Sequence, residues 1–203
     1  SNNITIGSAA AGGSTSSPTG PTQHFDGLID QVCIFDYGLS AGQVATLYGG
    51  GTAVTNPMGL SPAPVAYYQL GDQSVDNGAN YLVPNNSLQD YVFNLITGDY
   101  ISFANGSTMA RQQNISYSAW VNTTNLSTTQ YIVGNNTSSN QGTSIFILNS
   151  ASYPDRLVFQ FGDIVNFNNQ SYFNSIVSNL STYVSANEWF HVAASWDGTD
   201  SKI

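Results

Sequence analysis

The sequence predicts an all-β protein, a sandwich of two antiparallel sheets with one short helix. Short segments rich in aromatic and β-branched residues recur along the chain, separated by Asn, Ser and Gly, as is typical of β-sandwiches. The clearest segment lies within 187–198 and alternates with the period of a strand. We expect this strand to lie inside a sheet and to end in a hairpin turn at Asp197 and Gly198. One face is wholly apolar (Phe190, Val192, Ala194 and Trp196), and Trp189, His191 and Ser195 lie on the other.

Composition limits the partners of the chain. Of its 203 residues, 41% are hydrophobic, which is enough for a sizeable core. Only 7% are charged, against about 25% in an average protein. The formal net charge is −9, with 3 basic and 12 acidic residues, so no basic patch can form and we expect no nucleic-acid partner. No apolar run approaches the roughly 18 residues of a membrane-spanning helix, and we expect no membrane insertion. Cys33 stands alone and is expected to be a small buried hydrophobe.

The first 51 residues contain two predicted strands. Ile4 and Ile6 lie on one face of a short strand at the start, and a loop rich in Gly, Ser, Thr and Pro covers 8–22. Residues 25–37 follow as a strand with two apolar faces, which predicts a place in the middle of a sheet. Strict alternation puts Ile29, Cys33, Phe35 and Tyr37 on one face and Leu28, Val32 and Ile34 on the other.

The single helix is predicted at Ala41–Tyr48. Ser40 is a favourable N-cap, and Gln43 three residues later completes a capping box. Leu39 and Val44 have the spacing of a hydrophobic staple. The three glycines at 49–51 end the helix, because glycine is preferred just past a helix C-terminus.

The remainder of the chain consists of short strands and turns. Residues 166–180 have no clear period, and we expect a long aromatic loop there, with room for one turn of helix. In the core, we expect Tyr117 or Trp120, with Phe190 and Trp196, to be largely buried. Because the last residues stop within a strand, we expect the chain to be an excerpt of a longer protein. Strands are predicted at 66–70, 91–95, 100–103, 115–121, 131–133, 144–148 and 157–161.

Two stretches resemble laminin-G-like, concanavalin A-like jelly rolls. One is the pattern W-x-H-V-A-x-x-x-D-G at 189–198. The other is FDGLIDQV at 25–32, LSA at 39–41 and LY at 47–48, which follow the order of the family's closing segment. The resemblance implies a jelly roll of two antiparallel sheets. It leaves the activity open, because lectins, glycosidases and plain spacers share this fold.

The same resemblance predicts the domain organisation. Residues 1–51 resemble the C-terminal segment of one laminin-G-like repeat, 52–65 a linker, and 66–203 the N-terminal two thirds of a second repeat. NPMGLS at 56–61 and AYYQLGD at 66–72 are similar to repeat-containing structural proteins of marine bacterial viruses. Each piece alone leaves too little buried surface or an open sheet edge. We therefore expect 25–37 to insert into the sheet of 66–203 as one permuted sandwich, with 28–35 pairing with 66–70.

No enzymatic site is predicted. A retaining glycosidase needs two carboxylates about 5–5.5 Å apart, and the family's glucanases place theirs at alternate positions of one strand. Here the single glutamate, Glu188, lies in a turn before a strand. Neither His24 nor His191 has a partner at zinc-ligand spacing, and no nucleophile elbow supports a Ser–His–Asp triad. We expect His191 to be a packed, hydrogen-bonded side chain.

Calcium is the one cofactor with a physical case. This cation binds carboxylate and carbonyl oxygens of loops, and the resemblance to laminin-G-like domains implies a site at one rim of the sandwich. Asp72 and Asp99 are the predicted ligands, and Asp76 and Asp90 are alternatives. Aspartates that cap surface turns are the competing explanation.

The first functional hypothesis is a non-catalytic carbohydrate-binding or adhesion module of a multi-repeat extracellular or virion structural protein. Its expected partners are a cell-surface glycan, held by aromatic and amide side chains on rim loops, or neighbouring repeats of the same protein. The first alternative is a structural spacer or decoration domain that binds no sugar. A glycoside hydrolase is the third hypothesis.

Overall fold

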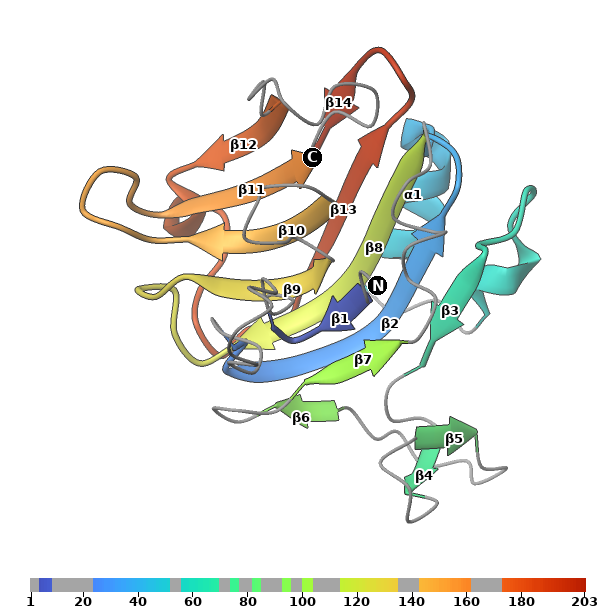
Figure 1. The fold of residues 1–203 in the computed structure, drawn as a ribbon, viewed down its shortest axis with the longest axis horizontal. Coiled ribbons are helices and arrows are strands. Elements are labelled where there is room, and N and C mark those ends of the chain that lie inside the picture. Colours follow the sequence, from blue (N-terminus) through green and yellow to red (C-terminus); the bar gives the residue numbers. More distant parts are fainter. Residues whose placement is uncertain are drawn as a thin grey trace, which may run out of the picture.

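Two antiparallel sheets form the two layers of the fold, seen in Figure 1 in a computed structural model of the chain. The structure describes residues 4–8, 24–51, 56–69, 74–76, 82–84, 93–95, 100–103, 114–134, 143–161 and 173–203. Sheet I has the order β12 (Phe173–Ser178), β11 (Arg156–Phe161), β10 (Thr143–Leu148), β9 (Gln130–Gly134), β1 (Ile4–Ile6) and β7 (Ile101–Phe103). Sheet II has the order β14 (Ser201–Lys202), β13 (Phe190–Trp196), β8 (Ile115–Thr123), β2 (Gly27–Phe35) and β3 (Ala66–Tyr68), and β6 (Phe93–Leu95) also pairs with β2. The prediction of an all-β jelly-roll sandwich is confirmed.

The predicted strands agree with the observed ones to within two residues at each end. The structure adds a separate hairpin of β4 (Ser74–Asp76) and β5 (Leu82–Pro84) that the sequence did not indicate. It also contains two short 3-10 turns, η1 (Pro57–Gly59) and η2 (Leu180–Thr182).

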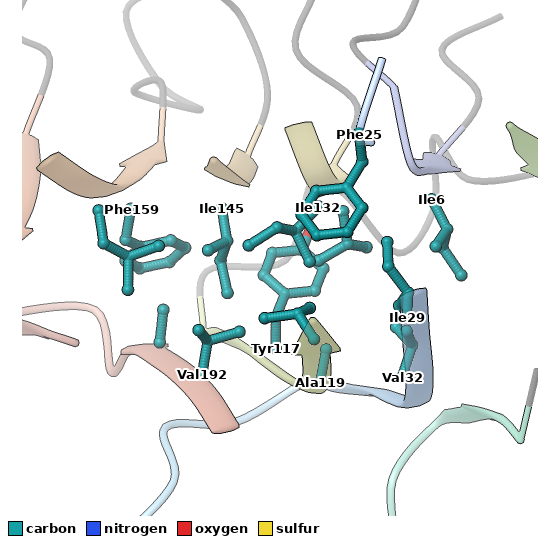
Figure 2. Packing of buried hydrophobic residues seen from close by; sticks show 14 of the residues in the cluster. Ile6, Phe25, Ile29, Val32, Tyr117, Ala119, Ile132, Ile145, Phe159 and Val192 are labelled. Carbon is teal, nitrogen blue, oxygen red and sulfur yellow. The ribbon is translucent and has the colours of Figure 1, made fainter. Parts of the chain in front are cut away.

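The main core lies between the two sheets. In β8, Ile115, Tyr117, Ala119 and Val121 point into it, as alternation predicts. The residues between them, Ser116, Ser118 and Trp120, point outward. Figure 2 shows Tyr117 and Val192 of sheet II facing Ile145 and Phe159 of sheet I. Ile4 and Ile6 belong to the same cluster. The sandwich therefore has one continuous apolar interior, which stabilises both layers.

Strand β13 has the predicted faces but a less buried aromatic pair than expected. Val192 and Ala194 are buried in the core, whereas Phe190 and Trp196 are half-buried and pack against its border. The two aromatic residues lie at the two ends of the strand, where the second layer covers them only in part. After Trp196, the predicted turn joins β13 to β14, and Gly198 adopts a φ of 93°.

Strand β2 corrects the predicted assignment of faces. Between Asp30 and Cys33 its register with β8 shifts, because β2 advances three residues while β8 advances two. This β-bulge contains Gln31, whose φ is 47°. The extra residue moves Ile29 onto the same face as Val32 and Ile34, in the main core. Cys33 and Phe35 lie on the opposite face in a second cluster, so the expectation that Ile29 shares their face was wrong.

Helix α1 (Ala41–Tyr48) covers that second cluster. Its predicted capping box is present: the Gln43 N–H donates to Ser40 Oγ at 3.2 Å, and the Ser40 N–H donates to Gln43 Oε1 at 2.9 Å. Gly49 ends the helix in the left-handed conformation. Leu39 and Leu47 pack with Cys33 and Phe35 against the outer face of sheet II, with Val44 at the edge of the cluster. Cys33 is buried as expected, and burial raises the pKa of its thiol to about 12.

Strand β12 corrects the expectation of a long loop at 166–180 over residues 173–178, whereas 166–172 lie outside the described residues. It pairs with β11 over six residues, from Phe173 opposite Phe161 to Ser178 opposite Arg156. β12 is the edge strand of sheet I, and Ile176 on it is exposed. An edge strand with an exposed apolar residue shows no clean alternation, so only the backbone pairing reveals it.

The predicted pairing of 28–35 with 66–70 is confirmed. Val32 lies opposite Tyr68, Cys33 opposite Tyr67 and Ile34 opposite Ala66. β2 thus lies between β3 and β8 in sheet II. The assignment of 1–51 and 66–203 to two different repeats stays a prediction.

Candidate functional site

The predicted calcium ligands fall mostly outside the described residues. Asp72, Asp90 and Asp99 lie there, and Asp76 ends β4, of which only the backbone is described. Among the residues that the structure describes, no group of three His, Cys, Asp or Glu side chains could hold a metal ion. Calcium binding at Asp72 and Asp99 stays a prediction.

Carboxylates are scarce on the strands. In the described strands of sheets I and II, the one acidic residue is Asp30 on β2, which is buried. Its Oδ1 accepts a hydrogen bond from the Gln31 N–H at 2.8 Å. Glu188 is exposed in the connection before β13. No described strand therefore carries two carboxylates at alternate positions, which is one way to supply the pair that retaining hydrolysis requires.

An aromatic cluster occupies the outer face of sheet II beside helix α1. His191 of β13 and Asp30 of β2 lie directly opposite Trp120 of β8, one on each side. The Tyr48 ring from the end of α1 stacks on Trp120, with 5.9 Å between the ring centroids. Trp120 and His191 also contact each other, at 5.3 Å between centroids. Trp120 is only 6% exposed, so the cluster joins the helix to the sheet.

Hydrogen bonding and burial indicate that this aromatic cluster stabilises the fold rather than binding a ligand. Ser118 Oγ and His191 Nε2 share a hydrogen bond of 2.8 Å. Burial lowers the pKa of His191 from 6.5 to about 4, so the ring is neutral at pH 7. Ser118 is buried and cannot meet a substrate. His191 is therefore a packed, hydrogen-bonded side chain, as predicted from the sequence.

A second candidate surface lies where the strands of both sheets turn. The pairing registers bring three connections to one edge of the sandwich, at the left of Figure 1. They are the β8–β9 turn (124–129), the β10–β11 turn (149–155) and the β12–β13 connection (179–189). We call these three segments the hairpin rim.

Hydrogen bonds join the three segments of the hairpin rim. Asp155 accepts from Ser181 twice, from the N–H at 2.9 Å and from the hydroxyl at 2.7 Å, and its carbonyl accepts from the Leu180 N–H at 3.1 Å. Asn149 Nδ2 donates to the carbonyl of Leu126 at 3.0 Å. The Asn187 N–H donates to the carbonyl of Thr123, at the end of β8, at 2.7 Å. These bonds hold the rim in one geometry.

The rim carries three exposed aromatic side chains. Tyr153 is 53% exposed, Tyr183 74% and Trp189 41%. The Arg156 guanidinium lies over the Tyr153 ring, 5.0 Å from its centroid. Asn179 and Asn187, on the same β12–β13 connection as Tyr183 and Trp189, are also exposed. Aromatic and amide side chains on rim loops are what the sequence led us to expect of a glycan site.

The sequence did not identify these aromatic residues individually, although it contained a signal. Tyr153 and Tyr183 stand in stretches rich in Ser, Thr and Asn, between segments with strand periodicity. An aromatic residue in a turn has no strand face on which to be buried. Exposure could therefore have been inferred from the turn composition alone, but the meeting of the turns at one edge could not.

Comparison with known families settles the ancestry. A family profile of the concanavalin A-like lectin/glucanases superfamily matches residues 95–203, more than half of the chain. The chain belongs to this superfamily. The match supports a carbohydrate-binding type of module in general, and it includes the whole hairpin rim. No curated protein and no solved structure matches the chain. Within the described ranges, no helix has both the length and the apolar character needed to cross a membrane.

Proposed function

We propose that the chain is a non-catalytic carbohydrate-binding or adhesion module. The observation that carries this proposal is the composition of the described strands of sheets I and II, in which Asp30, a buried residue, is the one carboxylate, within a superfamily of lectins and glucanases. Cleavage of a glycosidic bond needs an acid and a second carboxylate on either side of that bond. The described strands of sheets I and II lack this pair, which favours a module that holds a glycan without hydrolysing it.

We also propose a setting for the module: one of several repeats in an extracellular protein or on a virion surface. Its low charge content of 7% and its surface of Asn, Ser and Thr support this, because such a surface contacts neutral polymers without strong electrostatic selection. Calcium bound by Asp72 and Asp99 is part of the same proposal, as a fixed cation at the edge of the module.

A glycan-array measurement tests the function. The purified chain is applied to an array of neutral and acidic oligosaccharides, once with calcium and once with EDTA, and a reducing-sugar assay on β-glucans runs in parallel. We expect binding to a subset of glycans and no release of reducing sugar. Weaker binding in EDTA is the expected result for calcium.

The other hypotheses predict different results. A chain that binds no glycan under either condition would be a structural spacer or decoration domain. Sugar release that is lost in Glu188→Gln would make it a glycosidase and would overturn the proposal.

A further inference from the structure

We propose that the hairpin rim is the carbohydrate site, and that its ligand is an uncharged glycan whose sugar rings stack on Tyr183 and Tyr153. This inference rests on the proposed function, because it assigns that binding to one surface. The ligand is defined by chemistry: pyranose units with a face of C–H groups and a periphery of hydroxyls, and without carboxylate or sulfate.

The first argument is the accessibility of ring faces. Tyr131 and Phe146 stack on the outer face of sheet I, 4.6 Å between centroids, but both are buried. On the outer face of sheet II, Trp120 is buried beneath Tyr48. These two ring pairs on the broad faces therefore offer a ligand, among the described residues, mainly the exposed Tyr48. Among the described aromatic residues that are well exposed, three of five lie on the hairpin rim: Tyr153, Tyr183 and Trp189, against Tyr48 and Tyr100 elsewhere.

The second argument is preorganisation. Asp155 follows Tyr153 by two residues, and Ser181 precedes Tyr183 by two, so the Asp155–Ser181 hydrogen bonds fix the backbones that carry both rings. These backbones extend from β11 and β12, which are neighbours in sheet I and thus about 4.8 Å apart. A tyrosine side chain has few rotatable bonds, so little conformational entropy is lost when a ligand stacks on its ring.

The third argument is the character of the surface around the rings. The large apolar side chains of the rim other than its aromatic residues are at least half-buried: Leu126, Leu180 and Val184. The remaining exposed positions are mostly Ser, Thr and Asn. Protein-binding patches share the enrichment in Tyr and Trp, but they are depleted in Ser, which is abundant on this rim. Exposed amide side chains can both donate hydrogen bonds to sugar hydroxyls and accept them, so this surface suits a glycan.

The fourth argument is charge. Both carboxylate oxygens of Asp155 accept hydrogen bonds from Ser181, and the Arg156 guanidinium already lies over the Tyr153 ring. Of the two carboxylates in the rim, this leaves Glu188, which is exposed to solvent. Together with a net charge of −9, this environment repels sialylated or sulfated glycans and leaves neutral ones unaffected.

The test measures affinity for the neutral oligosaccharide that gives the strongest array signal, by titration calorimetry. The variants are Tyr153→Ala, Tyr183→Ala and their combination, with Tyr183→Phe retaining the ring. Tyr48→Ala is the matched control, because Tyr48 is exposed on the helix rather than on the rim. Circular dichroism and a melting curve establish that each variant folds.

We expect the double variant to lose affinity by about tenfold or more, as removal of aromatic anchors does. Tyr183→Phe and Tyr48→Ala should stay within about twofold of the wild type. Affinity should also change less than about twofold between about 0.05 and 0.5 M NaCl, because no ion pair is involved. A folded double variant that keeps full affinity, or binding restricted to acidic glycans and abolished by salt, overturns the rim assignment alone. A wild type that binds no glycan overturns the proposed function as well.

Discussion

Acidification should destabilise the protein through one partly buried histidine, His191. Burial lowers the pKa of His191 from 6.5 to about 4. Above pH 6.5 the ring is neutral in both the folded and the unfolded chain and has no effect on stability. As the pH falls below 6.5, the unfolded chain binds a proton that the folded chain does not, so the free energy of unfolding decreases. Below about pH 4 the folded chain binds the proton too, and the decrease levels off.

The size of the effect follows from the same pKa values. Each pH unit between them corresponds to about 1.36 kcal/mol, so the full loss is about 3 kcal/mol. That is a large part of the about 5–15 kcal/mol by which most domains are stable. The physical cause is the packing of the ring against Trp120 and Tyr48, where a charged imidazolium is poorly hydrated.

Urea unfolding between pH 7.5 and pH 4 measures this loss. The carboxylates also titrate in this range, so the quantity of interest is the difference in unfolding free energy between wild type and His191→Gln. We expect this difference to fall by about 3 kcal/mol from pH 7 to pH 4. Ser118→Ala is the control: it removes the hydrogen bond to His191 but leaves the ring buried, and it should keep most of the pH dependence.

Two results would refute this reasoning. One is a difference between wild type and His191→Gln that is the same at pH 7 and pH 4. The other is an NMR titration in which the C2 proton of His191 moves with a midpoint near 6.5 in the folded protein, because burial would then have no effect on its proton affinity.

Two further predictions concern packing. Gly27→Ala should destabilise the fold by about 2–3 kcal/mol, because a Cβ there would collide with the backbone oxygen of Asn122. The control is Gly59→Ala, where the space is open, and it should change the free energy of unfolding by less than about 0.5 kcal/mol. Equal melting temperatures for the two variants would contradict this prediction. Trp196→Ala should cost about 2–3 kcal/mol in urea unfolding, less than a fully buried tryptophan, because Trp196 is half-buried against the core. Trp189→Ala, on the exposed rim, should cost less than about 0.5 kcal/mol, and a larger loss there than at Trp196 would mean that the faces of β13 are reversed.

Local patterns in the sequence were enough for much of the fold. The alternation in 115–121 and 190–196 indicated strands and their inward faces, because side chains on a strand alternate whatever the strand pairs with. The capping box of Ser40 and Gln43 and the glycines after Tyr48 delimited α1, because these signals act within one helical turn. The absence of a glutamate pair also argued against hydrolysis, because such a pair can be recognised from residue type and spacing alone.

Pairing between distant segments decided the rest. The bulge at Gln31 placed Ile29 in the main core, because β2 must match β8 on one side and β3 on the other, and an extra residue absorbs the mismatch. β12 is a strand because β11 offers it a free edge, not because its own residues alternate.

The two candidate surfaces have the same origin. Tyr48, Trp120 and His191 come from three separate elements and meet only when α1 packs on sheet II. Tyr153 and Tyr183 share an edge because β10, β11 and β12 run antiparallel and turn at the same end. The sequence by itself determined most of the strands, the helix and the polar, weakly charged character of the turns. Only the tertiary structure decided which turns meet, because strand register is set by contacts between residues far apart in the chain.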